Sequence, residues 1–137
     1  MEQNFYSKEK ISALDAKFEA QKISFSPMTF QAVRALMELG ILQIVSDSGE
    51  KGICREDIAK AAGITEYGAG VLAEIALGMG VFRLSAQVAD SGKTAERYVL
   101  GKIGWFLLED NMTIVNFNFT NDVCYKGAFD LTESIRA

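Results

Sequence analysis

Apolar residues recur at steps of three and four positions in two short segments near the middle of the chain. In the first segment, residues 53–62, the apolar positions form a one-sided stripe, and Gly63 follows where a left-handed residue ends a helix. Thr65 then provides a suitable N-cap for the second segment, whose apolar positions continue until Gly80. Two short amphipathic segments around a glycine corner predict a helix-turn-helix.

A small β-hairpin is predicted directly after these helices. Residues 81–84 and 98–100 are strand-like runs separated by a polar, glycine-containing loop. Ile53 is placed to pair with this hairpin as a single strand residue. A helix-turn-helix followed by a hairpin is a winged helix, and this fold serves repressors, assembly modules and enzyme domains alike, so the fold alone assigns no function.

The N-terminal pattern predicts an amphipathic helix of about four turns over residues 7–21. Ile11, Leu14 and Phe18 share one face, and most charged residues of the segment lie elsewhere. The helix either folds back on its own domain or packs, as an arm, against a second subunit, because terminal helices need docking to be ordered. On the second interpretation these three residues are the candidate dimer interface.

Another helix is predicted to begin at Ser26 and Pro27, with serine at the N-cap and proline in the first turn, and to end at Gly40. A short apolar helix over residues 41–45 and a polar loop follow. After the wing, residues 102–108 are so apolar that we expect them to plug the core.

The C-terminal pattern is mixed. Residues 112–120 alternate in polarity as a strand would, yet wider apolar spacings fit a helix, and no turn residue closes a hairpin; we predict a helix. From Asp130 onward the chain reads as a further helix. The predicted fold is mainly α with a small β-hairpin, namely an N-terminal helical arm (1–24), a winged helix-turn-helix (25–108) and C-terminal linker helices (109–137).

Composition limits the number of domains and the kinds of partner that this chain can have. The chain has 137 residues, enough for one domain, and 49% are hydrophobic. Counted with its 12 Gly in place of its 4 Tyr, the apolar share is roughly 55%, above the usual 45 to 50%, and this surplus favours an interface with a partner. The net charge is -4, from 14 basic and 18 acidic residues, so the average field repels phosphate backbones. No stretch resembles a signal peptide or a membrane span, and Cys54 and Cys124 fit no metal spacing, so we expect a cytoplasmic protein with reduced thiols.

The sequence contains no histidine. This excludes Ser-His and Cys-His nucleophile pairs, His-ligated metals and the commonest general base. One motif needs separate treatment, since Gly68, Gly70 and Ala73 match a dinucleotide-binding G-x-G-x-x-A pattern and Asp90 lies at the distance of a ribose acid. The preceding residues predict a helix end and a cap, not a strand, so we expect no nucleotide here and assign the glycines to close helix packing.

The order of several weak motifs resembles the N-terminal winged-helix domain of S-adenosylmethionine-dependent small-molecule O-methyltransferases. The resemblance covers roughly residues 25–108 and, more loosely, residues 121–135. Two positions depart from the family, because Cys54 and Gly101 stand where it usually has threonine or serine, which weakens capping. The matching stretches are Leu39-Gly40-Ile41-Leu42, Ile58-Ala59, Ala62-Gly63-Ile64, Val71-Leu72, Gly80-Val81-Phe82 and Tyr98-Val99-Leu100 with Gly104 and Leu107.

The resemblance implies a dimerisation and substrate-lid domain that is inactive by itself. It implies a homodimer, a small-molecule acceptor in the full-length protein, and S-adenosylmethionine bound in a catalytic domain absent from these 137 residues, with no cofactor, metal or catalytic residue in this chain. Phe117, Asn121 and Tyr125 share one helical face and are the candidates for lining the acceptor pocket; packing in the core is the other interpretation. The acceptor and the methylated atom stay open.

A DNA-binding regulator and a stand-alone interaction module are the alternatives. A DNA reader needs basic or amide side chains on its recognition helix, but residues 66–80 contain no Lys, Arg, Asn or Gln. On the wing, Lys93 and Arg97 are offset by Asp90 and Glu96. We therefore expect neither nucleic acid nor a membrane among the partners.

Overall fold

A computed structural model describes residues 8–86 and 96–136. Its first helix, α2, runs without interruption over Ala13–Glu38, where two helices were predicted. Ser12 is its N-cap, and the Ser12 hydroxyl accepts the Asp15 backbone N–H at 3.1 Å. The prediction that Ser26 and Pro27 begin a new helix is wrong, because Pro27 lies inside α2.

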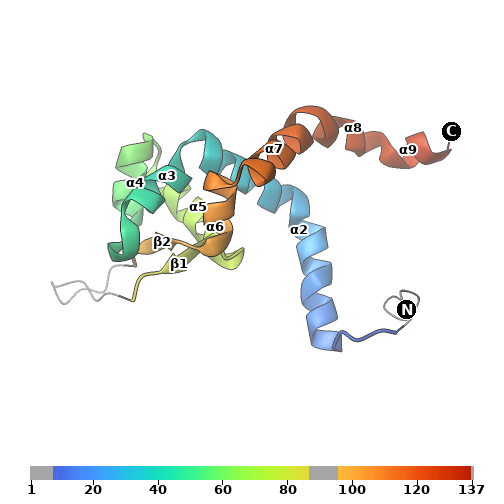
Figure 1. The fold of residues 1–137 in the computed structure, drawn as a ribbon, viewed down its shortest axis with the longest axis horizontal. Helices are drawn as coiled ribbons and strands as arrows, with labels where there is room; N and C mark the ends of the chain where they lie inside the picture. The colour runs from blue at the N-terminus through green and yellow to red at the C-terminus, as the bar shows by residue number, and fades with distance from the viewer. Residues whose placement is uncertain (1–7, 87–95, 137) are drawn as a thin grey trace.

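The sequence around Pro27 shows how α2 tolerates a proline. Proline has no N–H to donate to the carbonyl of Ile23, four residues earlier, so that carbonyl loses its helical partner. The Ser26 hydroxyl donates to this carbonyl at 2.8 Å and replaces the missing bond. Figure 1 shows α2 changing direction near its middle, as expected at an internal proline, so its first half leaves the compact part of the molecule.

The predicted helix-turn-helix is confirmed. Gly63 ends the first of its helices in the left-handed conformation, with φ 67°. Thr65 caps the second, because its hydroxyl accepts the Gly68 N–H at 3.0 Å. The helices that follow α2 are α3 (Ile41–Asp47), the short 3-10 helix η1 (Gly49–Lys51), α4 (Arg55–Ala62) and α5 (Glu66–Gly78), and α4 and α5 form the helix-turn-helix.

The wing is confirmed as well. Strands β1 (Phe82–Leu84) and β2 (Tyr98–Leu100) pair antiparallel, with Arg83 opposite Val99. Ile53 forms an isolated antiparallel bridge with Tyr98, as its position predicted. The loop positions Asp90 and Lys93 lie outside the described residues.

Helix α6 (Lys102–Glu109) approaches the end of the wing through its backbone. A Cβ atom at Gly104 would lie 2.5 Å from the Val81 carbonyl oxygen, so only glycine permits this approach. The expectation that the segment plugs the core is wrong in the main. Gly104 is its only buried residue, and the side chains of Ile103, Trp105 and Phe106 are about half exposed.

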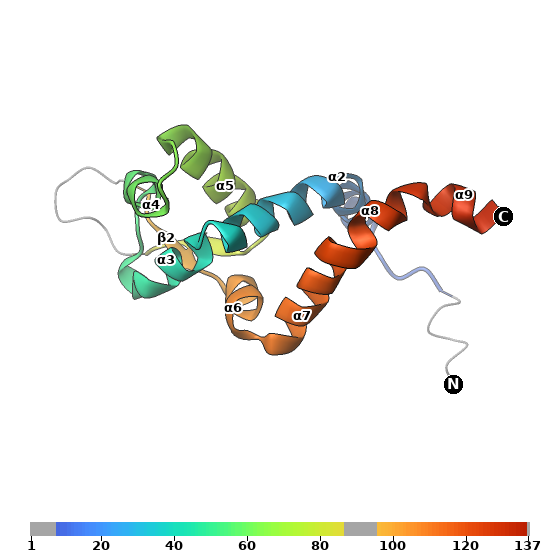
Figure 2. The ribbon, with the colours of Figure 1, turned by 90° about the horizontal axis from the view of Figure 1, so that it is seen from above.

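The C-terminal segment is helical, as predicted for residues 112–120. Asp110 caps α7, and its carboxylate accepts the Thr113 N–H at 2.8 Å. Figure 2 shows α7 rising toward α2, with the later helices continuing past it. These elements are α7 (Asn111–Phe119), the π-helix η2 (Thr120–Cys124), α8 (Tyr125–Gly127), η3 (Ala128–Asp130) and α9 (Leu131–Arg136).

One hydrophobic core holds the winged helix together. Its fully buried side chains come from the end of α2, from α3, from the two helix-turn-helix helices and from the wing. The largest of them are Phe82, Leu36, Ile41, Leu42, Ile58, Val45 and Val81. Among the described residues, the first half of α2 and all of α7–α9 contribute no buried hydrophobic residue. No single described helix is long and apolar enough to cross a membrane, although α2 and α3 pass on length and composition as a pair bent by 65°.

Candidate dimer interface and acceptor-side residues

The three predicted interface residues lie on the exposed N-terminal part of the chain. Leu14 is 63% exposed and Phe18 59% exposed on α2, and Ile11, 42% exposed, lies just before the helix. Farther along α2, Phe25 and Met28 are also more than half exposed. The arm therefore presents a long row of large apolar side chains to solvent.

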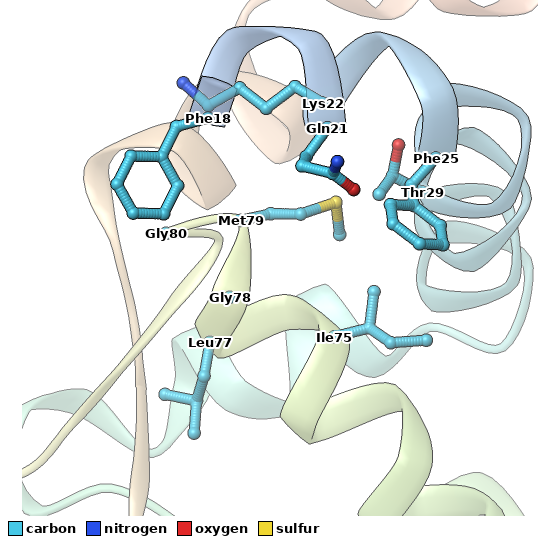
Figure 3. Close-up of a pocket in the computed structure, with 10 residues that line it drawn as sticks. All are labelled: Phe18, Gln21, Lys22, Phe25, Thr29, Ile75, Leu77, Gly78, Met79 and Gly80. Atoms are coloured by element: carbon cyan, nitrogen blue, oxygen red, sulfur yellow. The ribbon is translucent and has the colours of Figure 1, made fainter. Parts of the chain in front are cut away.

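A groove separates this arm from the end of α5. Figure 3 shows Phe18 and Phe25 on the α2 side, with Gln21 directed between them, while Ile75 and Met79 reach across from α5 and its C-cap. The groove has a volume of about 940 Å³. Its lining residues are Phe18, Gln21, Lys22, Phe25, Thr29, Ile75, Leu77, Gly78, Met79 and Gly80.

Most of these lining residues were missed by the sequence analysis. The apolar period that links Ile11, Leu14 and Phe18 continues to Phe25 and Met28, which extends the same face across Pro27. That continuity was the available signal, and it was hidden by taking Pro27 as the start of a new helix. The contribution of Met79 depends on how α5 crosses α2, so no local pattern could reveal it.

On another side of α2, aromatic rings join it to the C-terminal helices. The ring of Phe30 stacks on Phe117 with centroids 4.3 Å apart and planes 9° apart. Phe30 also stacks on Tyr125, with centroids 5.1 Å apart. The Tyr125 hydroxyl donates to the Pro27 carbonyl at 3.3 Å. Two of the three predicted acceptor-side residues thus meet on one ring of α2, which the sequence analysis did not single out.

Asn121, the third candidate, lies in the π-helix between these two residues. Its side-chain amide donates to the Asp122 carboxylate at 2.9 Å. Phe117, Asn121 and Tyr125 are all half-buried, so they do not belong to the buried core and each keeps some surface that another molecule could contact.

The surface of α5 opposite the core lacks the chemistry of a DNA reader. Arg55, next to this helix, pairs with Glu56 at 3.0 Å. The pKa of Glu56 is lowered, first by the hydrogen bond from its own backbone and then by the Arg55 side chain. Arg55 lines the surface hollow beside α5 together with two acidic residues, Glu66 and Glu74.

The two arginines that the structure describes at the wing both bind within the chain itself. The Arg97 guanidinium donates to the carbonyls of Lys51 and Gly52, at 3.0 and 2.7 Å. One guanidinium nitrogen of Arg83 donates to both carboxylate oxygens of Glu50, each at 2.6 Å. Arg97, which the sequence analysis considered for phosphate contact, is thus committed to holding the loop before α4 against the wing.

The dinucleotide-like motif lies inside a helix, as expected. Gly68 is in the first turn of α5, and its N–H binds Thr65. The interpretation that the glycines permit close helix packing is wrong, because a Cβ at Gly68 would meet only the hydroxyl of its own N-cap, Thr65, at 3.2 Å, and one at Gly70 would meet nothing nearer than Arg55 at 3.9 Å. Ala69 and Ala73 are the residues that α5 buries along this stretch.

Cys54 occupies the N-cap of α4 without capping it through its side chain. Its Sγ lies 3.3 Å from the Asp57 carboxylate. Burial raises the pKa of the Cys54 thiol, and the Asp57 carboxylate adds to this, so the neutral thiol is favoured. Within residues 8–86 and 96–136, no group of three Cys, Asp or Glu side chains is arranged to hold a metal ion.

The chain is similar to one known domain family. Residues 17–88, just over half of the chain, match the Dimerisation2-like domain. No curated protein sequence matches the chain.

Two solved structures share the fold. The apo S-adenosylmethionine-dependent methyltransferase SibL has a TM-score of 0.65 and 21% identity, over 84% of this chain and 31% of SibL. Human N-acetylserotonin methyltransferase (ASMT), in complex with SAM, has a TM-score of 0.64 and 14% identity, over 96% of this chain and 36% of the enzyme. The chain thus spans about a third of the length of either protein.

Proposed function

Because the chain belongs to the Dimerisation2-like domain family, we propose that it is the homodimerisation and substrate-lid domain of a small-molecule S-adenosylmethionine-dependent methyltransferase. The observation that carries the proposal is the exposed apolar face of α2, from Leu14 to Met28, beside the groove at the end of α5. Large contiguous apolar patches on a soluble protein mark interaction sites. We expect a domain of a dimerisation family to self-associate through such a face, because the dimer removes its apolar side chains from water.

The lid role is assigned to α7 and the π-helix that follows it. The half-buried rings of Phe117 and Tyr125 could stack on an aromatic acceptor, and the Asn121 amide could hydrogen-bond to it. Support comes from the way these residues are held, since both rings rest on Phe30 of the same helix that carries the dimer face. Acceptor contact and dimer contact would then be connected through α2.

Cofactor binding is assigned to a catalytic domain outside these residues. Such enzymes hold S-adenosylmethionine on a glycine-rich loop after a buried strand, and the glycine motif of this chain lies in α5 instead. The proposed division into an arm (1–24), a winged helix (25–108) and linker helices (109–137) describes the roles of these segments. The arm is not a separate folding unit, because α2 crosses the first boundary as one helix.

The test is to measure assembly and cofactor binding of the 137-residue chain together. Sedimentation equilibrium should give a dimer at micromolar concentration, and titration calorimetry should give no heat with S-adenosylmethionine. Single-species behaviour as a monomer up to about 100 µM, corresponding to a Kd weaker than most specific homodimers, would contradict the proposal. Saturable cofactor heat would contradict the assignment of the cofactor to another domain.

A further inference from the structure

The apolar face of α2 has a seven-residue repeat. Leu14, Phe18, Gln21, Phe25 and Met28 are separated by alternating steps of four and three, which is the a/d spacing of a helix that packs along a second helix. Ile11 extends the repeat before the helix, and Ala32 and Ala35 extend it after. We call this row, Leu14 to Met28, the α2 seam.

Within the chain, the repeat is covered only beyond the C-terminal end of this row. Where α2 continues past the seam, α5 packs against it and Ala32 is buried. Helix α5 stops at Gly78, and beyond that point the groove opens beside Phe18, Gln21 and Phe25. The groove volume of about 940 Å³ corresponds to roughly two turns of a helix about 10 Å across. A helix of another molecule can therefore continue along α2 where α5 ends.

Building on the proposed homodimer, we propose that the occupant of this groove is the α2 seam of a second copy, running antiparallel. In an antiparallel pair, each a residue packs opposite a d residue of the other helix. Leu14 then faces Phe25 of the second copy, and Phe18 faces Gln21. The same contacts recur in reverse order, so the face is self-complementary about a twofold axis, as a closed dimer requires.

Charge supports this orientation. Asp15 and Lys22 occupy the same flanking position of successive repeats, where antiparallel helices place matching positions side by side. In the proposed register, Asp15 of each copy lies next to Lys22 of the other, which gives two opposite-charge pairs. Within one chain these residues are two turns apart, and Lys22 instead contacts Glu19 at 2.8 Å.

Cross-linking between cysteine variants tests the register. In a Cys54→Ser, Cys124→Ser background, Leu14→Cys and Phe25→Cys are made in separate chains and treated with a short bismaleimide. The mixture should give cross-linked dimer at least about tenfold above either chain alone, because each residue faces the other across the twofold. Ile23→Cys, on a different face of α2 and 75% exposed, is the matched control and should not cross-link to either. Efficient cross-linking of Leu14→Cys to itself would indicate a parallel pair and overturn the proposal.

A charge exchange tests the same register without cross-links. Asp15→Lys and Lys22→Asp should each weaken the dimer by roughly fivefold, and the double variant should restore it, because only the intermolecular pairs regain opposite charges. Sedimentation equilibrium measures all four proteins. A dimeric parent whose charge variants show no rescue, or whose mixed cysteines do not cross-link, refutes the seam while leaving homodimerisation intact; a monomeric parent refutes both.

Discussion

The two halves of α2 have the same apolar spacing and opposite surroundings. After Pro27, the helix buries Ala32, Val33 and Leu36 against the winged helix. Before Pro27, apolar side chains as large or larger remain exposed, Ile23 and Phe18 among them. Apolar periodicity therefore says that a face will be covered, but it does not say by which molecule. The half that its own domain covers stabilises the fold, and the other half is available for assembly.

The largest expected effect contrasts one residue from each half. Leu36 is fully buried, so Leu36→Ala should lower the free energy of unfolding by about 3 kcal/mol through lost burial and a cavity. Phe25→Ala removes a larger side chain from the exposed half and should leave the unfolding of the monomer nearly unchanged. Urea denaturation monitored at two protein concentrations measures both. A comparable loss in Phe25→Ala under monomeric conditions would show that the arm folds onto its own domain.

The close approach of α6 offers the next effect. Gly104→Ala places a Cβ 2.5 Å from the backbone oxygen of Val81 and should cost roughly 1–3 kcal/mol of stability, since that backbone belongs to the wing. Gly78→Ala is the control, because a Cβ there meets nothing within 4 Å. The midpoint of thermal unfolding should be clearly lower for Gly104→Ala than for Gly78→Ala. Equal midpoints would mean that α6 shifts freely to make room for the added Cβ.

The connection between α2 and the C-terminal helices gives a smaller effect. Phe30→Ala should remove the ring on which Phe117 and Tyr125 stack and so increase amide hydrogen exchange across residues 111–127, by a factor of about ten for each 1.4 kcal/mol lost. Tyr125→Phe keeps the stacking and loses only the hydrogen bond to Pro27, so its exchange should change far less. Unchanged exchange in Phe30→Ala would show that these helices are held elsewhere.

The Ser26 hydroxyl beside Pro27 should contribute more to the stability of α2 than the nearby Ser24 hydroxyl does. Ser26→Ala leaves the Ile23 carbonyl without a protein partner and should cost about 0.5–1 kcal/mol of helix stability, because solvent replaces part of the bond. Ser24→Ala is the matched control, since the Ser24 hydroxyl binds the Ala20 carbonyl, which also accepts a helical N–H. Circular dichroism of the two thermal transitions distinguishes them, and equal losses would contradict this account of the proline.

The smallest effect concerns pH at the start of α7. Hydrogen bonds from Thr113, first from its side chain and then from its backbone, lower the pKa of Asp110. A lowered folded-state pKa means that the cap stabilises the helix above the ordinary aspartate pKa and loses this contribution as pH falls through the lowered value. Amide exchange at the α7 start should rise over that acidic range, and Asp110→Asn, which does not titrate, should abolish the dependence.

The sequence by itself determined the winged helix, because each part depends on short-range chemistry. Gly63 ends α4 through its left-handed backbone conformation, and Thr65 begins α5 through its own hydroxyl. The strand-like runs on either side of the polar loop pair as neighbours. The absence of base-reading side chains on α5 was equally a property of the sequence. Family membership followed from the order of these parts.

Only the tertiary structure decided what long-range contact controls. Pro27 stays inside α2 because Ser26 replaces its missing bond and the second half of the helix is held against the core. Helix α6 lies at the surface, since Gly104 brings its backbone to the wing and the side chains of Ile103, Trp105 and Phe106 remain about half exposed, while Leu107 and Leu108 pack against the core. The groove beside Gln21 exists because α5 ends where it does. A local pattern indicates that a face is apolar, but the path of the whole chain determines what packs against that face.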